Sequence, residues 1–415
     1  MNYGSMFKGT QVKMLTSAMA LALATSVASA QESVDYDNAE FKKQTSAEAF
    51  EADVAILARE KGADKAAIAR AMKFQEKFEA QAQELMEKFP NKISRIWLEP
   101  APSQMAHVQF VGRVPSVQLP ANVSVQGGGR FSLQENIQRA EHMADVLKKA
   151  GKRNFMTYFD ARTGKVKVEM AMPNPAKGPN KAKVLEILQR SAKRDQDMPR
   201  GLQAITEGDI DLEVIQSDEE IYTLEHSRGG NWLRDDGFRE CTSGWAVSGP
   251  NGDGIVTAAH CTGLNQFEES TSSIYSMTWR SQERGNGDAE YHTTTHIEPA
   301  EFWATSASIR DVNSIKSTIF MFPGSSVCEY GRSSNTRTCN HDVIATGVTA
   351  TFTDGVTVKN LVRVSGDNSI GGDSGGGWSW NNKAWGVHSG SNGSTSLFTP
   401  VQRVQKELNV TIKKK

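Results

Sequence analysis

Residues 254–261 of this chain are GIVTAAHC, and residues 371–376 are GGDSGG. The first segment is a β-branched run that ends at His260, and the second is a glycine-rich turn that holds Ser374. From about His226 onward, short β-branched runs alternate with turns rich in Gly, Ser and Asn, and helical patterns are scarce. This spacing predicts an all-β barrel or sandwich for the C-terminal half of the chain.

The composition changes near residue 225. Before this point the chain is rich in Lys, Glu and Ala and holds no cysteine, whereas Gly, Ser, Thr and Trp increase after it. Periodicity and turn signals predict helices over 47–61, 65–88, 181–194 and 401–408, a helix from the capping box of Ser132 and Glu135 to Gly151, a hairpin of 155–160 and 165–170, and extended chain over 209–225. The first part is therefore predicted to be an α+β region, and 415 residues allow two domains.

The segments around His260 and Ser374 resemble the His and Ser signatures of the trypsin/chymotrypsin superfamily. Upstream of them, CTSGWAV at residues 241–247 resembles the strand that precedes the His loop in that family. The resemblance covers about residues 228–410, with both signatures in the family's order. It implies an all-β double antiparallel barrel of the chymotrypsin-like kind, and a serine endopeptidase of the bacterial streptogrisin and α-lytic protease branch.

The chemistry that this resemblance implies explains the residue types. A serine hydroxyl is a weak nucleophile at neutral pH, so His260 would act as general base for Ser374 and return the proton to the leaving amine. A carboxylate would fix the imidazole tautomer and stabilise the imidazolium. The glycines let backbone N–H groups turn inward, and the amides of Gly372 and Ser374 would form the oxyanion hole.

Asp288 is the candidate for that carboxylate. It lies in GNGDAEYHT at residues 285–293, which resembles the D-x-x-W/Y-H stretch of streptogrisin and α-lytic-type proteases. Asp311, in IRDVN at residues 309–313, is the alternative, although its surroundings are typical of a surface turn. A chain without a triad carboxylate would be an inactive, protease-like binding protein.

The chain holds four cysteines, which are Cys241, Cys261, Cys328 and Cys339. An even number in an exported chain predicts two disulfides. Three pairings are possible, and the spacings favour the two local loops, Cys241–Cys261 and Cys328–Cys339. No C-x-x-C pair occurs, so zinc binding is the weaker interpretation, and we expect neither a metal nor a cofactor.

The sequence departs from the bacterial branch at two places. The loop from Cys328 to Cys339 resembles the C-x-x-G-R-T-T…C loop of that branch, but a further cysteine that usually precedes the GDSG segment has no counterpart in residues 364–371. Relatives tend to carry a basic residue where this chain has Glu329. Because such a base helps to hold the Asp next to the nucleophile, the partner of Asp373 is left open.

In these proteases two segments wall the pocket for the residue before the cleaved bond. Here they are residues 367–371 and 386–391. A pocket for Lys or Arg usually has an acid six residues before the nucleophile, and this chain has Asn368 there, which disfavours trypsin-like cleavage. The nearby Asp367 keeps that specificity as an alternative.

The second wall resembles that of glutamyl endopeptidases, where a histidine and serine hydroxyls meet an acidic side chain. A histidine beside hydroxyls can donate charge-assisted hydrogen bonds to a carboxylate. The predicted pocket residues are Ser369, His388, Ser389, Gly390 and Ser391. We therefore predict cleavage after Glu or Asp, and the alternative is that His388 is a strand histidine satisfied by the backbone.

The N-terminus predicts a secretory signal. Lys8 and Lys13 give it a basic start, residues 14–27 are small and apolar, and residues 28–30 form an A-x-A cleavage site. The apolar run is shorter than the roughly 20 residues that a membrane anchor needs. We expect no membrane span and secretion to the extracellular space or periplasm. The net charge of -1 gives no reason to expect nucleic acid or an anionic membrane as a partner.

The predicted domains are a signal peptide (1–30), a pro-region (31–225) and a serine protease domain (226–415). The pro-region resembles the propeptides of α-lytic-type proteases in size and position only, and those act as folding catalysts and inhibitors. Slow folding of all-β barrels with non-local pairing fits such a role. The expected partners are protein or peptide substrates and the chain's own pro-region, and the mature protease is expected to be a monomer.

The start of the mature protease is expected between Glu225 and Gly230. Cleavage after Glu225 would be self-processing under the glutamyl hypothesis, whereas cleavage after Arg228 would require another enzyme. Two alternatives stay open for the first region. It could be an attached binding domain, or it could be the working part that a self-cleaving protease domain serves.

Overall fold

The structure is a computed structural model that describes residues 41–171, 210–215, 230–270, 272–295 and 299–415, together with Glu186. The expected signal peptide, most of the expected helix over 181–194 and most of the expected maturation segment lie outside these residues. In the described part of the chain, no helix combines the length and the apolar character that crossing a membrane requires.

An eight-stranded antiparallel sheet carries the segment that leads to His260. The strands follow one another in the order β24-β10-β11-β14-β13-β12-β8-β9. Their bounds are β8 Trp232–Asp235, β9 Phe238–Thr242, β10 Trp245–Gly249, β11 Gly252–Thr257, β12 Gln266–Ser270, β13 Ser273–Arg284, β14 Asp288–Thr294 and β24 Thr411–Ile412. Its core is built from alternating strand residues such as Val247, Val256 and Tyr291, whose side chains are buried together.

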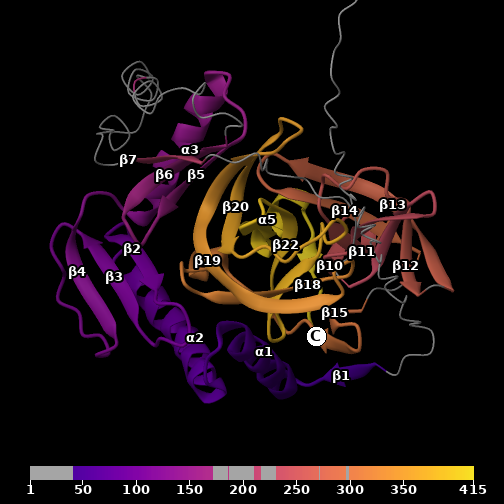
Figure 1. The fold of residues 1–415 in the computed structure, drawn as a ribbon, viewed down its shortest axis with the longest axis horizontal. Coiled ribbons are helices and arrows are strands. Elements are labelled where there is room, and N and C mark those ends of the chain that lie inside the picture. The colour runs from indigo at the N-terminus through magenta and orange to yellow at the C-terminus, as the bar shows by residue number, and fades with distance from the viewer. Residues whose placement is uncertain (1–40, 172–185, 187–209, 216–229, 271, 296–298) are drawn as a thin grey trace, which may run out of the picture. The chain divides into compact units, whose positions relative to one another are not determined.

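A second antiparallel barrel carries the turn that holds Ser374. Its six strands run in the order β18-β21-β22-β23-β20-β19, and a further pairing of β18 with β19 closes the ring (Figure 1). The bounds are β18 Ser326–Gly331, β19 Thr336–Thr351, β20 Thr357–Ser365, β21 Gly377–Trp380, β22 Lys383–Ser391 and β23 Thr395–Pro400. The helix α5, Val401–Leu408, follows β23 as predicted. These two sheets form the predicted all-β double-barrel fold.

The N-terminal region is α+β, as the sequence predicts. Its elements are β1 Lys42–Gln44, α1 Ser46–Lys61, α2 Lys65–Lys88, β2 Ile93–Leu98, β3 Ala106–Val111, β4 Val123–Gly129, α3 Leu133–Lys149, β5 Phe155–Asp160, β6 Lys165–Ala171 and β7 Ile210–Ile215. The predicted capping box of Ser132 and Glu135 opens α3, and a second one, Thr45 with Glu48, opens α1. The extended chain predicted over 209–225 is described only as β7.

The N-terminal region shares backbone pairing and core with the second barrel. Strand β5 pairs with β19, where Thr157 faces Thr349 and Met156 faces Ala350. Helices α1 and α2 pack against the core of that barrel. The helices contribute Val54, Leu57, Ala58, Ile68, Ala71 and Met72, and the barrel strands contribute Trp378, Trp380, Trp385 and Phe398. Full burial of each larger aliphatic side chain contributes roughly 1.5–3 kcal/mol, so these two helices belong to the folded unit.

A buried ion cluster adds a polar link between the same parts. Asp53 of α1 accepts hydrogen bonds from Arg310 at 2.9 and 3.0 Å and from Arg337 at 2.7 and 2.9 Å. Arg310 lies on β16, Ser308–Asp311, which pairs with β1 and with β15, Glu301–Thr305. The three side chains are almost fully buried. Removing one partner from such a cluster typically costs about 3–5 kcal/mol because a buried charge is left uncompensated.

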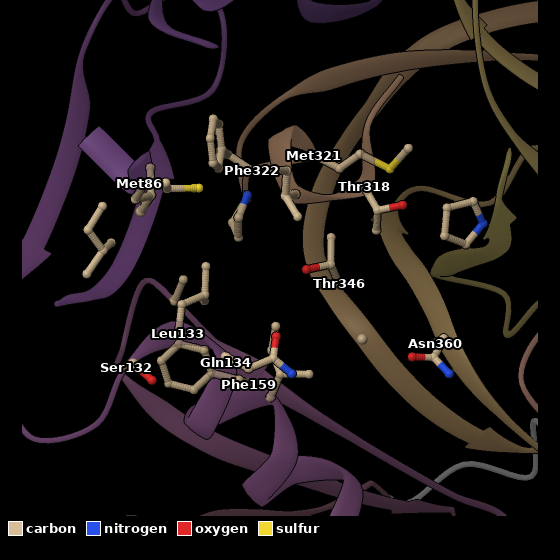
Figure 2. A pocket seen from close by; sticks show the side chains of 18 of the residues that line it. Met86, Ser132, Leu133, Gln134, Phe159, Thr318, Met321, Phe322, Thr346 and Asn360 are labelled. Atoms are coloured by element: carbon tan, nitrogen blue, oxygen red, sulfur yellow. The ribbon is translucent and has the colours of Figure 1, made fainter. Parts of the chain in front are cut away.

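A cavity of about 480 Å³ lies between the two parts. Figure 2 shows its lining, which includes Met86 of α2, Leu133 of α3, Phe159 of β5, Thr318 of the short helix η2 (Thr318–Phe320) and Thr346 of β19. The lining is largely apolar. None of the residues predicted to form the active site or the substrate pocket takes part in it.

Candidate active site

His260 and Asp288 meet because their strands are neighbours. Strand β11 ends at Thr257, three residues before His260, and it pairs with β14, which begins at Asp288. The Oδ2 atom of Asp288 lies 2.6 Å from Nδ1 of His260, and its Oδ1 accepts the backbone N–H of His260 at 3.1 Å. An ionised carboxylate can only accept, so Nδ1 carries the proton and Nε2 keeps the lone pair that a general base needs.

Asp288 is fixed from the second barrel as well. Its backbone N–H donates to Oγ1 of Thr399 on β23 at 2.9 Å. The hydroxyl of Ser389 on β22 lies 3.1 Å from the same Oγ1. These contacts link the backbone of Asp288 to Thr399 on β23 and, through Thr399, to Ser389 on β22, so the position of Asp288 depends on how the two barrels dock. They also place the Ser389 hydroxyl beside Thr399.

The turn that holds Ser374 packs against the segment that leads to His260. The carbonyl oxygen of Ser374 accepts the N–H of Thr242 at 2.9 Å. The neighbour of Thr242, Cys241, forms a disulfide with Cys261, which follows His260 directly. Gly375 has a φ of +85°, and a Cβ atom there would lie 2.1 Å from Oγ1 of Thr257, so this close approach requires glycine. Ser374 itself is 1% exposed.

The ring of His260 is held on one side, through Nδ1. The Nε2 atom of His260 is buried and has no hydrogen-bond partner in the described chain. Catalytic hydrogen bonds are often long in unliganded enzymes and tighten when substrate binds. Asp311, the alternative carboxylate, lies elsewhere and pairs with Lys43 at 2.6 Å and with Lys415 at 3.1 Å.

Asp373 has backbone partners in place of a basic side chain. Its carboxylate accepts the N–H groups of Ser333 at 3.0 Å, Ser334 at 3.2 Å and Ile370 at 3.0 Å. Burial, with the nearby charge of Glu329, raises the pKa of Asp373 to about 6. These amides supply the partner that the sequence left open, and no side-chain pattern could have revealed them because every residue except proline carries the same N–H group.

The predicted pocket residues are placed on two segments near this turn. Ser369 donates its hydroxyl to Oδ1 of Asp367 at 2.8 Å, and Oδ2 of Asp367 accepts the N–H of Gly393 at 2.8 Å. Asp367 therefore braces two loops with both oxygens. Gly390 has a φ of +147°, and Ser391 faces Ser396 across β22 and β23.

His388 is buried on β22 beside the nucleophile turn. Its backbone carbonyl accepts the N–H of Gly375 at 3.0 Å, and its N–H donates to Gly376 at 2.8 Å. Its Nδ1 accepts the indole N–H of Trp378 at 3.3 Å, and the two rings stack with centroids 5.9 Å apart. The His388 ring is therefore held by an aromatic side chain. The alternative considered from the sequence was that backbone groups make its hydrogen bonds.

The four cysteines form the two local disulfides that their spacing favours. Cys241 bonds to Cys261, and Cys328 bonds to Cys339. Asp53 lies close to the second pair, but sulfur atoms in a disulfide do not offer thiolate ligands. The described cysteines therefore serve as covalent links.

Comparison with known proteins gives one curated relative. No protein-family model matches the chain. The chain is similar to Serine protease 1 of Streptomyces fradiae, with 30% identity over 193 residues, 44% of this chain and 52% of that protein. The chain thus spans about half the length of this relative.

Solved structures of bacterial proteases are similar to a part of the chain. A Nocardiopsis protease is 26% identical, with a TM-score of 0.38, and the match covers 45% of this chain and 98% of that one. The chymotrypsin of Cellulomonas bogoriensis is 25% identical, with a TM-score of 0.38, and covers 45% and 98%. A glutamic acid specific protease described as using a histidine triad in substrate binding is 23% identical, with a TM-score of 0.38 and coverage of 45% and 100%.

The two signature segments lie within the double-barrel topology, and the curated relative is a serine protease. The chain is thus similar to a bacterial serine protease, and its two sheets have the double-barrel fold of the chymotrypsin-like kind.

Proposed function

We propose that the chain is a serine endopeptidase that works through Ser374, His260 and Asp288. The observation that carries the proposal is the 2.6 Å contact between Asp288 and Nδ1 of His260, which leaves Nε2 as the basic nitrogen next to the nucleophile turn. The Ser374 hydroxyl would attack the carbonyl carbon of a peptide bond while His260 takes its proton. His260 then gives that proton to the leaving amine, and water releases the acyl group from Ser374 by the same steps in reverse.

The oxyanion that forms during attack needs two inward-facing donors. We assign them to the backbone amides of Gly372 and Ser374. Gly372 has a φ of +117°, which a residue with a side chain rarely adopts, so this turn depends on glycine. Removal of one such donor costs about 2.7–4 kcal/mol in measured cases, so each of these two amides is expected to contribute substantially to the rate.

Labelling with a fluorophosphonate tests the activity directly, because only an activated serine reacts. The wild-type protein should label and should digest added casein repeatedly, whereas Ser374→Ala should do neither. Absence of labelling in folded wild-type protein would indicate a protease-like binding protein. Labelling and self-cleavage without turnover of casein would indicate a protease domain that acts once on its own chain.

For the substrate we propose cleavage after Glu, with Asp as second choice, through His388. Its backbone bonds to Gly375 and Gly376 set this residue beside the nucleophile, and Asp367 is engaged in bracing loops, which argues against a pocket for Lys or Arg. Ser369, Ser389 and Ser391 are the candidate hydroxyls, of which that of Ser389 contacts Thr399 and that of Ser369 donates to Asp367.

Cleavage-site profiling of a peptide library tests this preference. Wild type should cut mainly after Glu. In His388→Gln, kcat/KM for Glu substrates should fall at least about thirtyfold, because truncating one partner of a buried charged contact costs about 2–5 kcal/mol. Cuts after aromatic or small residues in the wild-type profile would exclude the acidic preference and leave the protease assignment untouched.

We further propose that residues 1–30 direct export, that residues 31–225 are a pro-region and that the protease domain starts near residue 226. The two disulfides suit an oxidising compartment. Recovery of the protein from a culture medium or periplasm tests export, and N-terminal sequencing of the pro-form and of the mature form tests the cleavages after residues 30 and 225. A start after Glu225 would support self-processing, and a start after Arg228 would point to a second protease.

A further inference from the structure

A buried carboxylate lies between two buried histidines behind β22. Oε1 of Glu329 on β18 is 3.4 Å from Nε2 of His341 on β19, and Oε2 is 3.8 Å from Nδ1 of His388. The two histidine side chains are 0% and 3% exposed, and that of Glu329 is 9% exposed. The proposed triad uses neither Glu329 nor His341. Burying three ionisable side chains together is unfavourable unless opposite charges offset one another. A cluster that the protein keeps at this cost is a candidate for a functional role.

The hydrogen bonds of His341 fix its protons. Nδ1 of His341 lies 2.8 Å from the carbonyl oxygen of Ser365, and a carbonyl only accepts, so Nδ1 carries a proton. Nε2 faces Oγ1 of Thr338 at 2.9 Å and the carboxylate of Glu329. Burial works against a charged ring, but the charge of Glu329 outweighs it and raises the pKa of His341. His341 and Glu329 therefore form an ion pair.

The ring of His388 is held in the opposite state. The indole of Trp378 can only donate, so Nδ1 of His388 must present its lone pair, and the proton of the neutral ring is on Nε2. Burial lowers the pKa of His388. Among the charged groups that act on it, Glu329 and Asp367 favour the protonated ring, whereas His260 and His341 oppose it. A neutral His388 is a weak partner for an acidic side chain.

We propose that Glu329 is a positioning residue for specificity, which supplies the counter-charge for a proton that His388 takes up when an acidic side chain binds. This proposal rests on the proposed preference for Glu or Asp. The substrate carboxylate meets the N–H at Nε2, and a proton from solvent adds to Nδ1. Once Nδ1 carries a proton, it can no longer accept the indole N–H of Trp378. The new N–H at Nδ1 instead faces Oε2 of Glu329. One proton is bound, and no covalent bond to the substrate forms or breaks.

Glu329 also repels the substrate carboxylate, and distance decides between the two effects. The carboxylate of Glu329 is 3.8 Å from Nδ1 of His388. The substrate would sit beyond Nε2, on the far side of the ring, and so roughly twice as far from Glu329. Coulomb energies fall with distance, so attraction to the imidazolium outweighs repulsion of the substrate.

Two peptide substrates that differ only in Glu or Gln before the cleaved bond test the proposal. Active enzyme is counted by fluorophosphonate labelling, and kcat and KM are measured between about pH 6 and 9. In wild type, the ratio of kcat/KM for Glu over Gln should fall as pH rises, approaching tenfold per unit above the midpoint, because one proton is linked to binding. In Glu329→Gln the ratio should fall at least tenfold, mainly through KM, and should be flat with pH.

Glu268→Gln is the matched control. Glu268 is also a buried carboxylate, and it is paired with Arg234 and Arg239 in the other sheet. Loss of this carboxylate should leave the Glu/Gln ratio and its pH slope as in wild type. A structural effect of any buried Glu→Gln change would move both variants alike.

His341→Gln gives a second variant with the opposite sign. It removes the positive neighbour that opposes protonation of His388, so the Glu preference should persist to higher pH. If Glu329→Gln yields no labelled enzyme, the test is the pH midpoint of the Glu/Gln ratio of kcat/KM in His341→Gln. A midpoint that is unchanged or lower than in wild type overturns the proposal. A wild-type preference for Glu that survives in Glu329→Gln with the same pH slope overturns the proposal alone. A wild type without acidic preference overturns the substrate assignment and the proposal together.

Discussion

Two histidine–carboxylate pairs lie close to the same nucleophile turn, and they differ in distance. Asp288 holds Nδ1 of His260 at 2.6 Å, whereas Glu329 stands 3.8 Å from Nδ1 of His388, whose lone pair is taken by Trp378. In the first pair the carboxylate makes a hydrogen bond and so fixes both the tautomer and the orientation of the ring. In the second it acts only through its charge. A histidine with a carboxylate therefore performs a geometric task in one place and an electrostatic task in the other.

The contacts that hold the two carboxylates in place are consistent with these two roles. The carboxylate of Asp288 accepts the backbone N–H of His260, and the backbone N–H of Asp288 donates to Thr399. The side chain of Asp288 therefore has little freedom to rotate. Glu329 is balanced by a second histidine, His341, which shares its charge. A substitution at Asp288 should thus affect every substrate, while one at Glu329 should affect acidic substrates selectively.

The largest expected effect comes from Asp288→Asn. This change should lower kcat about ten-thousandfold for Glu and Gln substrates alike, because an amide no longer selects the productive tautomer of His260. Steady-state kinetics with titrated active sites measures it. Asp311→Asn is the control and should stay within about twofold of wild type. Equal losses in both variants, or none in either, would remove Asp288 from the triad.

The next effect concerns the burial of the Asp373 carboxylate, to which the nearby charge of Glu329 adds. The raised pKa of about 6 means that the ionised carboxylate is disfavoured in the folded protein. This contribution to stability is fully present below the pKa of the unfolded chain, near 3.9, and is lost as pH rises through about 6. A shift of about two units corresponds to about 3 kcal/mol.

Urea unfolding between about pH 4 and 8 measures this contribution. The comparison is between Ser374→Ala, which prevents self-digestion, and Ser374→Ala with Asp373→Asn. The asparagine form should lose the pH-dependent part, so the free energies of unfolding of the two proteins should diverge across this window. Parallel curves would show that the pKa of Asp373 is ordinary in the folded state.

A smaller effect is expected from Thr399→Val. The change keeps the side-chain shape and removes the hydroxyl that receives the backbone N–H of Asp288. An unpaired buried donor costs about 1–3 kcal/mol, so kcat should fall about tenfold with little change in KM. Ser389→Ala, which removes only the neighbouring hydroxyl, should stay within about threefold. If the ratio of kcat/KM for Glu over Gln substrates fell while kcat stayed unchanged, the Asp288–His260 pair and the Glu329–His388 pair would not act independently.

Much of the fold and part of the site followed from the sequence because their signals are local. Helix α2 spans the predicted residues 65–88, and β5 covers the predicted 155–160, since periodicity depends only on near neighbours. The segments around His260 and Ser374 were found because their residues are contiguous. Asp288 needed a resemblance, since nothing in its own segment states that β14 pairs with β11.

The remaining contacts depend on sheet register and on residues far apart in the chain. Asp53 meets Arg310 and Arg337 across more than 250 positions, and Glu329 meets His341 only through the bulged pairing of β18 with β19. A one-residue slip of register would turn such side chains to the other face. The register shift between His388 and Gly390 interrupts regular alternation in β22, so the sequence alone does not state which neighbours of His388 share its face.

The pairing of β5 with β19 also bears on how the protein behaves in solution at high concentration. Residues Thr349 and Ala350 of β19 receive their neighbouring strand from the N-terminal region. A protease domain freed of that region would present this stretch as an open sheet edge. Such edges accept strands from other molecules, so the freed domain should self-associate more readily than the intact chain as concentration rises, and the expected monomer should hold only in dilute solution.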